Sequence, residues 1–285
     1  MKNYLCALAV AVTIVMSQGA FAATVDLVNN TSGSLNGALY YRASVAPAGS
    51  GVIDSFVRVN PGGGQDFSQG YNTDLRPLQY DENTSSTFTH ALQLSVVPIV
   101  TIGGVDYREF ILDINQTNSD PLLTLNRVVI SLRNAGNLGG ATVAAGSRLG
   151  ASGAALFSEA DVIAYDSGSG NKVQMDYGLE SGSGRGDMFL YVPNSAFTGP
   201  NAFVYLYSEF GFLIGDKACQ DNANAAKLQT CYANANDGYE EWAVRGAGAE
   251  QVSEPAAMVL LGAGLVGVAI ARGKLGRSTG KGRKR

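Results

Sequence analysis

Carboxylates are the side chains in this sequence that are most suited to catalysis or ligand binding. They gather in two short segments, "YNTDLRPLQYDEN", which holds Asp74, Asp81 and Glu82, and "NDGYEEW", which holds Asp237, Glu240 and Glu241. Loops with several oxygen ligands can hold calcium, but neither segment has the spacing of an EF-hand. Solvated charge at strand ends is the simpler interpretation. We therefore predict no cofactor and no metal residues, with calcium left open as an alternative.

Catalytic groups are harder to find. A glycoside hydrolase needs two carboxylates at a suitable separation, and with 24 Asp and Glu in the chain any chosen pair is uninformative. His90 is the only histidine, and no nucleophile motif accompanies it. The "RGD" at 185–187 reads as a Gly-rich turn that ends at a strand, rather than as an adhesion motif. We expect a protein that is not an enzyme and has no catalytic residues.

Aromatic side chains offer a second kind of chemistry. Faces of aromatic rings can stack on the apolar faces of sugar rings, and such a platform could be built from Trp242, Tyr205, Tyr207, Tyr191 and Tyr239. Aromatic residues in strands are more often part of a core. The platform requires rings that face outward in a row, and burial of these rings would exclude it.

The elements that must position these side chains are strands. In "YREFILDIN", period-two alternation places Phe110, Leu112 and Ile114 on one face, with Arg108, against Tyr107, Glu109, Ile111 and Asp113, as in a half-buried strand. The segments "RVVISLR" and "KVQMDYGL" alternate in the same way, and "TIGGVDY" predicts a hairpin at Gly103-Gly104. Many short strands with Gly-rich turns predict an all-β fold, an antiparallel β-sandwich that is jelly-roll-like.

One stretch of the body does not fit this pattern. Residues 134–160 are rich in Gly, Ala and Ser and have little to bury. Strand patterns resume directly after them, so we predict a long surface excursion rather than a linker between domains.

The N-terminus has the pattern of a secretory signal. Lys2 precedes an apolar run from Leu5 to Met16, and Ala20-Phe21-Ala22 fits the small-x-small cleavage rule. Residues 1–22 are predicted to be a signal peptide with a helical apolar core, and a bare N-terminal membrane anchor is the alternative. Cys6 lies within the apolar run, away from the cleavage point.

Two cysteines, Cys219 and Cys231, remain after the signal. An even count in an exported chain favours a disulfide between them. A metal site is the weaker alternative, because two Cys without a nearby His give too few soft ligands.

The charge of the body limits its partners. Residues 23–255 hold 12 Lys and Arg against 24 Asp and Glu, a net charge of −12. An acidic surface of this size repels phosphate backbones, so nucleic-acid binding is disfavoured. It also repels acidic polysaccharides unless a divalent cation bridges the two.

The C-terminal end is apolar and then basic. Residues 256–271 carry no charge, and seven Lys and Arg follow. As a helix this run would be roughly 24 Å long at about 1.5 Å per residue, somewhat shorter than the hydrocarbon core of a bilayer. The cationic end stays cytoplasmic once the N-terminus has driven export, so we predict a stop-transfer transmembrane helix at 256–271.

The order of this tail resembles the PEP-CTERM sorting signal of Gram-negative bacteria. The usual "VPEP" start is matched by Val252, Glu254 and Pro255, with Ser253 in place of the first proline. The resemblance implies recognition and removal of the tail by exosortase at the inner membrane, followed by transfer to the cell surface or the extracellular space.

The body is similar to a group of PEP-CTERM proteins that share segments close to "YNTD", "YREFILDINQ", "GSGRGDMFLYVPNSAF" and "DGYEEWAV". The likeness implies a shared β fold and an exopolysaccharide or biofilm context, and it transfers no site residues.

These observations predict three parts: a signal peptide at 1–22, a β-sandwich domain at 23–250 and a sorting signal at 252–285. The expected function is that of a surface or matrix protein with exopolysaccharide as a partner. A carbohydrate-binding module of the same fold is the alternative, followed by a glycan-active enzyme.

Overall fold

The computed structural model describes residues 22–43, 53–60, 67–139, 162–168, 170–179, 186–211, 235 and 238–245. These ranges consist of strands and loops, with three single-turn 3-10 helices among them, so the prediction of a β-rich body is confirmed. Within them, no helix has the length and apolar character needed to cross a membrane. The helices predicted for the signal peptide and for residues 256–271 lie outside the described residues.

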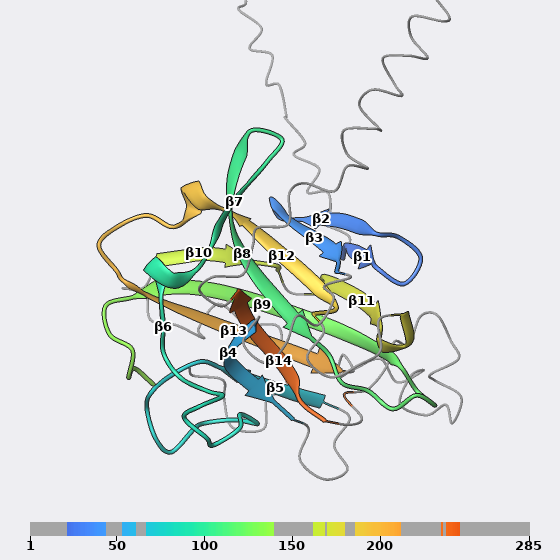
Figure 1. The fold of residues 1–285 in the computed structure, drawn as a ribbon, viewed down its shortest axis with the longest axis horizontal. Helices are drawn as coiled ribbons and strands as arrows, with labels where there is room; N and C mark the ends of the chain where they lie inside the picture. The colour runs from blue at the N-terminus through green and yellow to red at the C-terminus, as the bar shows by residue number, and fades with distance from the viewer. Residues whose placement is uncertain are drawn as a thin grey trace, which may run out of the picture.

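The described strands form two sheets of seven strands each (Figure 1). Sheet A has the order β1-β11-β9-β13-β5, with β10 also paired to β9 and β6 to β13. Its strands are β1 (Thr24–Asp26), β5 (Phe67–Tyr71), β6 (Leu92–Gln93), β9 (Leu122–Arg133), β10 (Val162–Asp166), β11 (Lys172–Asp176) and β13 (Phe203–Gly211). The pair β1 and β11 is parallel, and the other pairs within this sheet are antiparallel.

Sheet B has the order β2-β3-β12-β8-β14-β4, with β7 also paired to β8, and its pairs are antiparallel. Its strands are β2 (Ser32–Leu35), β3 (Ala38–Arg42), β4 (Ile53–Val59), β7 (Ile99–Ile102), β8 (Val105–Asp113), β12 (Met188–Pro193) and β14 (Glu240–Arg245). The 3-10 turns are η1 (Leu94–Val96), η2 (Tyr177–Leu179) and η3 (Asn194–Ala196).

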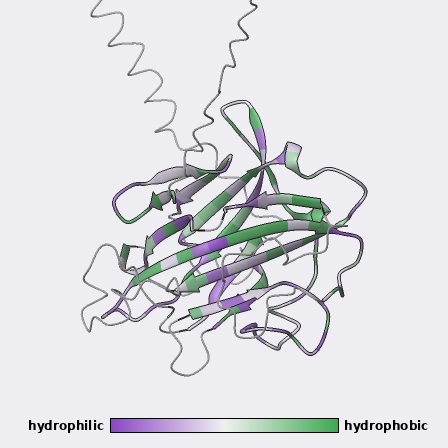
Figure 2. Ribbon diagram, turned by 180° about the vertical axis from the view of Figure 1, so that it is seen from behind, coloured by the Kyte–Doolittle hydropathy of each residue, from purple (hydrophilic) through white to green (hydrophobic). Residues whose placement is uncertain are grey.

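The inner faces of the two sheets share one hydrophobic core. Its members come from every part of the described chain and include Tyr40, Phe56, Phe110, Ile130, Leu206 and Trp242. The hydroxyl groups of Tyr40 on sheet B and Tyr165 on sheet A lie 2.7 Å apart inside this core. Seen from behind, apolar and polar residues follow one another along the strands (Figure 2), as expected where alternate side chains point to opposite faces.

The alternation in β8 predicts its inner face correctly, since Phe110, Leu112 and Ile114 lie in the core. The prediction that this strand is half-buried is wrong for its second half, where Glu109 and Asp113 on the opposite face are also buried. The same holds for β9, where Arg127, Val129, Ser131 and Arg133 are buried on the outer face. Parts of both outer faces are therefore buried, and ion pairs make burial of charged groups such as Arg127 and Glu109 possible.

The strand predicted from "KVQMDYGL" ends early. Val173 and Met175 enter the core as expected, but the strand stops at Asp176, whose Oδ1 accepts the N–H of Gly178 at 2.8 Å. This local bond favours a turn over a continued strand. Tyr177 and Leu179 therefore lie in η2, and Leu179 is exposed.

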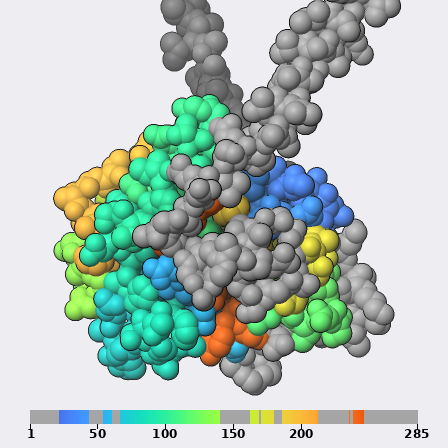
Figure 3. Space-filling view, viewed as in Figure 1, coloured from blue at the N-terminus to red at the C-terminus, as the bar shows by residue number. Residues whose placement is uncertain are grey.

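Two hairpins close with residues in the left-handed region. Gly103 and Gly104 have φ of 59° and 81° and join β7 to β8, which confirms the predicted turn. Asn36 and Gly37, with φ of 47° and 85°, join β2 to β3 in the same way. In Figure 3 the β2–β3 hairpin, in blue, lies at one side of the molecule, and the β7–β8 hairpin, in green, lies at the top.

Candidate functional site

The five aromatic residues predicted as a platform do not form one. Trp242 has no exposed surface and lies in the shared core, where it faces away from solvent. Tyr205 and Tyr207 lie on the outer face of sheet A and are also fully buried. Tyr191 belongs to the outer face of sheet B, and Tyr239 is exposed just before β14. The predicted row of rings was wrong for two reasons. Successive residues of a strand point to opposite faces, and the strands that carry these rings belong to different sheets.

Loops cover the rings of Tyr205 and Tyr207. With Tyr71 and Val129 these two tyrosines form a second, smaller apolar cluster. The hydroxyl of Tyr205 donates to the carbonyl of Ala135 at 2.8 Å and accepts the N–H of Leu138 at 3.0 Å. This cluster therefore anchors the loop after β9, and it offers no open surface to a ligand.

The carboxylates of the first acidic segment accept hydrogen bonds from backbone N–H groups. Asp74 accepts the N–H of Ala91 at 2.9 Å, and Asp81 accepts that of Gln69 at 3.0 Å. Glu82 accepts the N–H groups of Tyr71 and Tyr80 at 3.0 and 2.7 Å. Burial raises the pKa of Glu82, while these hydrogen bonds act in the opposite direction. The three carboxylates hold the loop between β5 and β6.

The second acidic segment is divided between the two faces of β14, and Asp237 lies outside the described residues. Glu240 is buried and accepts hydrogen bonds from the Asn115 backbone and the Gln116 side chain at 3.1 and 2.5 Å. Burial raises the pKa of Glu240 well above its ordinary value, and nearby carboxylates add to this. Glu241 forms an ion pair with Arg58 at 2.6 Å. In the part of the chain that the structure describes, no three His, Cys, Asp or Glu side chains are grouped as metal ligands.

His90 and Asp187 also have local structural partners. The two ring nitrogens of His90 each lie 2.9 Å from a backbone carbonyl oxygen, those of Ala91 and Ser55, which ties the loop before β6 to β4. Asp187, the last residue of the "RGD" sequence, accepts the N–H of Ile114 at 2.8 Å directly before β12 begins. Both side chains therefore help to hold the backbone of neighbouring segments.

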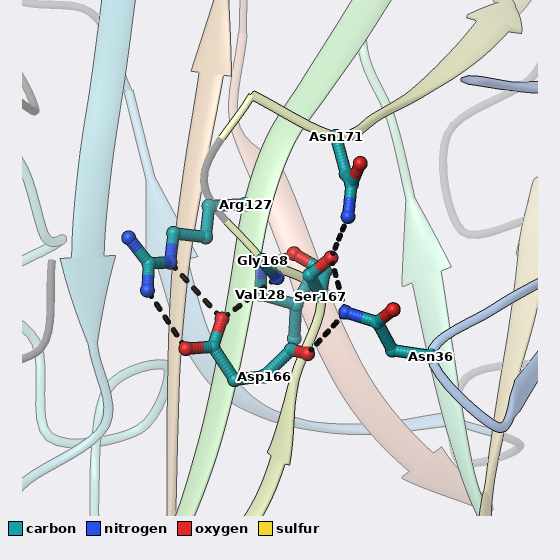
Figure 4. A network of polar contacts seen from close by, with 7 residues as sticks. All are labelled: Asn36, Arg127, Val128, Asp166, Ser167, Gly168 and Asn171. Atoms are coloured by element: carbon teal, nitrogen blue, oxygen red, sulfur yellow. Dashed lines mark hydrogen bonds and ion pairs between the residues drawn. The ribbon is translucent and has the colours of Figure 1, made fainter. Parts of the chain in front are cut away.

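A polar junction connects the two sheets at one end (Figure 4). Arg127 donates to both carboxylate oxygens of Asp166, at 3.1 and 2.7 Å. The side chain of Asn36, in the β2–β3 turn, donates to the carbonyls of Asp166 and Ser167 at 3.1 and 2.9 Å. Asn171 donates to the same Ser167 carbonyl at 2.6 Å. The junction fixes the turn after β10 against the β2–β3 hairpin.

The outer face of sheet B carries a different group of aromatic rings, which we call the sheet B aromatic face. It consists of Tyr41 on β3, Tyr107 on β8, and Phe189 and Tyr191 on β12. The ring of Tyr191 lies at the centre, 5.7 Å from those of Tyr41 and Phe189 and 6.5 Å from that of Tyr107. Tyr191 is only 8% exposed, whereas the three rings around it are partly exposed.

An ion pair borders this aromatic face. Glu109 is fully buried and is paired with Arg245 at 2.5 and 2.9 Å, and it also accepts the hydroxyl of Tyr191 at 3.1 Å. The hydrogen bond to Glu109 raises the pKa of Arg245, against the effect of burial. Burial, and then the Glu109 carboxylate, raise the pKa of Tyr191. The guanidinium of Arg245 also lies 5.4 Å from the ring of Phe189.

Only Tyr191 of this aromatic face was among the residues predicted from the sequence. The alternation of residues along the strands already indicates that the other rings lie on the outer face. Tyr107 lies on the face of β8 opposite to Phe110, and Phe189 alternates with the core residues Met188 and Leu190. What the sequence did not reveal is that β3, β8 and β12 are neighbours in one sheet.

Comparison with known proteins locates one motif. A family model described as the PEP-CTERM protein-sorting motif matches residues 251–274. The chain carries a PEP-CTERM sorting motif. No curated protein and no solved structure matches the chain.

The PEP-CTERM match contains the predicted sorting residues Val252, Glu254 and Pro255 and most of the apolar run. A PEP-CTERM motif implies an exported protein that exosortase processes at the membrane, with transient anchoring before transfer to the surface. The sorting residues lie outside the described part of the chain, as do Cys219 and Cys231, so the disulfide stays a prediction.

Proposed function

We propose that this PEP-CTERM protein is a non-enzymatic component of the cell surface or the extracellular matrix, and that it associates with exopolysaccharide. The observation that carries the proposal is the sorting motif at 251–274, followed by a terminal cluster of positive charge. In this proposal the body that remains after sorting is a sandwich of two β-sheets, a framework suited to display surfaces.

The proposal that the protein is not an enzyme is supported by the structural contacts of the residues that catalysis would need. His90, Asp74, Asp81 and Glu82 bond to backbone groups of the fold. Glu240 is fully buried, and Glu241 is paired with Arg58. These side chains stabilise loops and strand ends, which is the role expected in a display framework rather than a catalyst.

A carbohydrate-binding module is the second candidate, and one specific observation favours it. The sheet B aromatic face presents three partly exposed rings beside an internally neutralised ion pair. The net charge of −12 on residues 23–255 disfavours direct contact with anionic polymers. Neutral polysaccharide is the partner that both properties permit.

The sorting half of the proposal is tested by fractionation of native cells that express tagged variants. Glu254→Ala combined with Pro255→Ala should leave the full-length chain in the inner membrane, whereas the wild type should appear shortened in the surface or extracellular fraction. Ser253→Pro is the matched control, because it restores the usual proline of the family and should be sorted at least as well as the wild type. Identical distribution of all three proteins would refute sorting through this motif.

A further inference from the structure

The residues of the sheet B aromatic face belong to rows of the backbone register that cross one half of the sheet. The backbone register places Ser32, Tyr41, Phe189 and Ile111 in one row over β2, β3, β12 and β8. The next row contains Ser34, Leu39, Tyr191 and Glu109. Side chains in one such row point to the same side of a sheet, and these point away from the shared core. Within these rows Tyr191, Glu109 and Ile111 are buried. The accessible surface consists of the partly exposed Leu39, Tyr41 and Phe189, with the exposed Ser32 and Ser34 at the β2 edge.

We infer that this surface, centred on Tyr41, Tyr107 and Phe189, binds a neutral polysaccharide. The inference rests on the proposed function, since it names the site and the ligand class of the exported body. Three partly exposed rings from three strands offer faces and edges against which the apolar faces of sugar rings can pack. Each ring is fixed on a strand, so little conformational entropy is lost when a ligand binds.

The charge of the surface selects a neutral ligand. The guanidinium of Arg245 lies 5.4 Å from the ring of Phe189, and Glu109 neutralises it through two contacts. An anionic sugar would have to compete with a buried carboxylate for this guanidinium, which carries a desolvation cost. Among the described residues, the charge that lies beside the rings is therefore neutralised within the protein, which favours a neutral sugar over a uronate or a phosphate.

Hydrogen-bonding groups lie at the β2 edge of this surface. Ser32 and Ser34 are exposed and lie opposite Tyr41 and Leu39 in the register. A sugar stacked on Tyr41 would bring its equatorial hydroxyls toward these serines. An apolar centre with a polar rim is the usual composition of a binding surface.

Comparison with the outer face of sheet A distinguishes this surface from a second buried core. Tyr205 and Tyr207 on the outer face of sheet A are fully buried, and the hydroxyl of Tyr205 is bonded to the loop after β9. Tyr41, Tyr107 and Phe189 are partly exposed. Rings that only completed a core would gain from full burial.

The test measures binding of the full-length chain, purified in a detergent without a sugar headgroup, to immobilised β-glucan, mannan and galactan in EDTA. Tyr41→Leu and Phe189→Leu keep apolar volume but remove the aromatic face, and each should weaken binding about tenfold. Tyr41→Phe keeps the ring and should bind within about threefold of wild type. Tyr239→Leu is the matched control, because this exposed tyrosine lies outside the surface, and it should bind like the wild type.

Retention on at least one neutral polysaccharide, lost in the two ring variants and kept in the control, supports the site. The inference is overturned if no neutral polysaccharide is retained, if folded ring variants bind like wild type, or if only anionic polymers bind and need calcium. Self-association that the same ring variants abolish would show instead that a second copy occupies the surface. Because binding is measured without sorting, a chain that binds glycan equally well with and without the rings refutes the site alone, and a chain that is sorted but binds no glycan refutes the site and the polysaccharide part of the proposed function. A chain that binds glycan but is never processed refutes the proposed function alone.

Discussion

Glu209 is a buried carboxylic acid on β13, and it makes stability depend on pH. Burial raises its pKa from 4.5 to about 8, although the Asn126 side chain and Arg127 act in the opposite direction. Between these two values the unfolded chain releases the proton and the native chain keeps it. The free energy of unfolding should therefore fall as pH rises from 4.5 to about 8 and then level off, with a slope of up to about 1.4 kcal/mol per pH unit.

Glu209→Gln should reduce this slope, because the amide does not titrate. Stability should match that of the wild type at pH 4.5 and exceed it at pH 8. Glu240 has a pKa raised in the same direction, so part of the slope will remain. Urea unfolding followed by the fluorescence of Trp242, the single tryptophan, measures the effect, and Asp54→Asn at an exposed position is the control. Equal slopes in Glu209→Gln and wild type would contradict the assignment.

At the scale of elements, Asn36 combines two roles in the β2–β3 turn. Its φ of 47° suits Asn, and its side chain donates to two carbonyls of the β10–β11 turn. Asn36→Gly keeps the left-handed backbone and removes only the donor, so unfolding free energy should fall by about 1–3 kcal/mol. Gly37→Asn is the comparison variant: its Cβ would meet no atom within 4 Å, so its cost reports only the backbone strain of a side chain at a φ of 85°.

Urea denaturation of these two variants separates the roles. A larger loss of stability in Asn36→Gly than in Gly37→Asn would show that the hydrogen bonds, more than the backbone of the turn, hold the junction. An Asn36→Gly protein as stable as the wild type would mean that the junction of Figure 4 adds nothing to stability.

Strand identity was predictable from residues such as Phe110, Leu112 and Ile114, because period two depends only on neighbours in the sequence. The hairpin at Gly103-Gly104 was predictable for the same reason. The burial of Glu109 was not, since its partner Arg245 is 136 positions away. Local patterns contain no information about which distant strand becomes a neighbour, and this is also why the aromatic platform was placed on the wrong residues.

For the whole molecule, the oxidation state of the two cysteines tests whether the protein is exported to an oxidising compartment. Cys219 and Cys231 should be joined in protein from the periplasm or the surface, where disulfides persist. Peptide mapping without reductant should recover one cross-linked pair, and removal of the link should cost on the order of 3 kcal/mol. Two cysteines that both react with an alkylating agent would contradict this prediction.

The central claim for the whole molecule is that its C-terminal end is a temporary sorting device. Residues 251–274 match the PEP-CTERM motif, and the apolar run at 256–271 is somewhat short for a permanent span. Intact-mass spectrometry of the protein from native cells tests this most directly. The mature chain is predicted to begin near Ala23 and to end near Pro255. A membrane-bound chain that still ends at Arg285 would contradict the account.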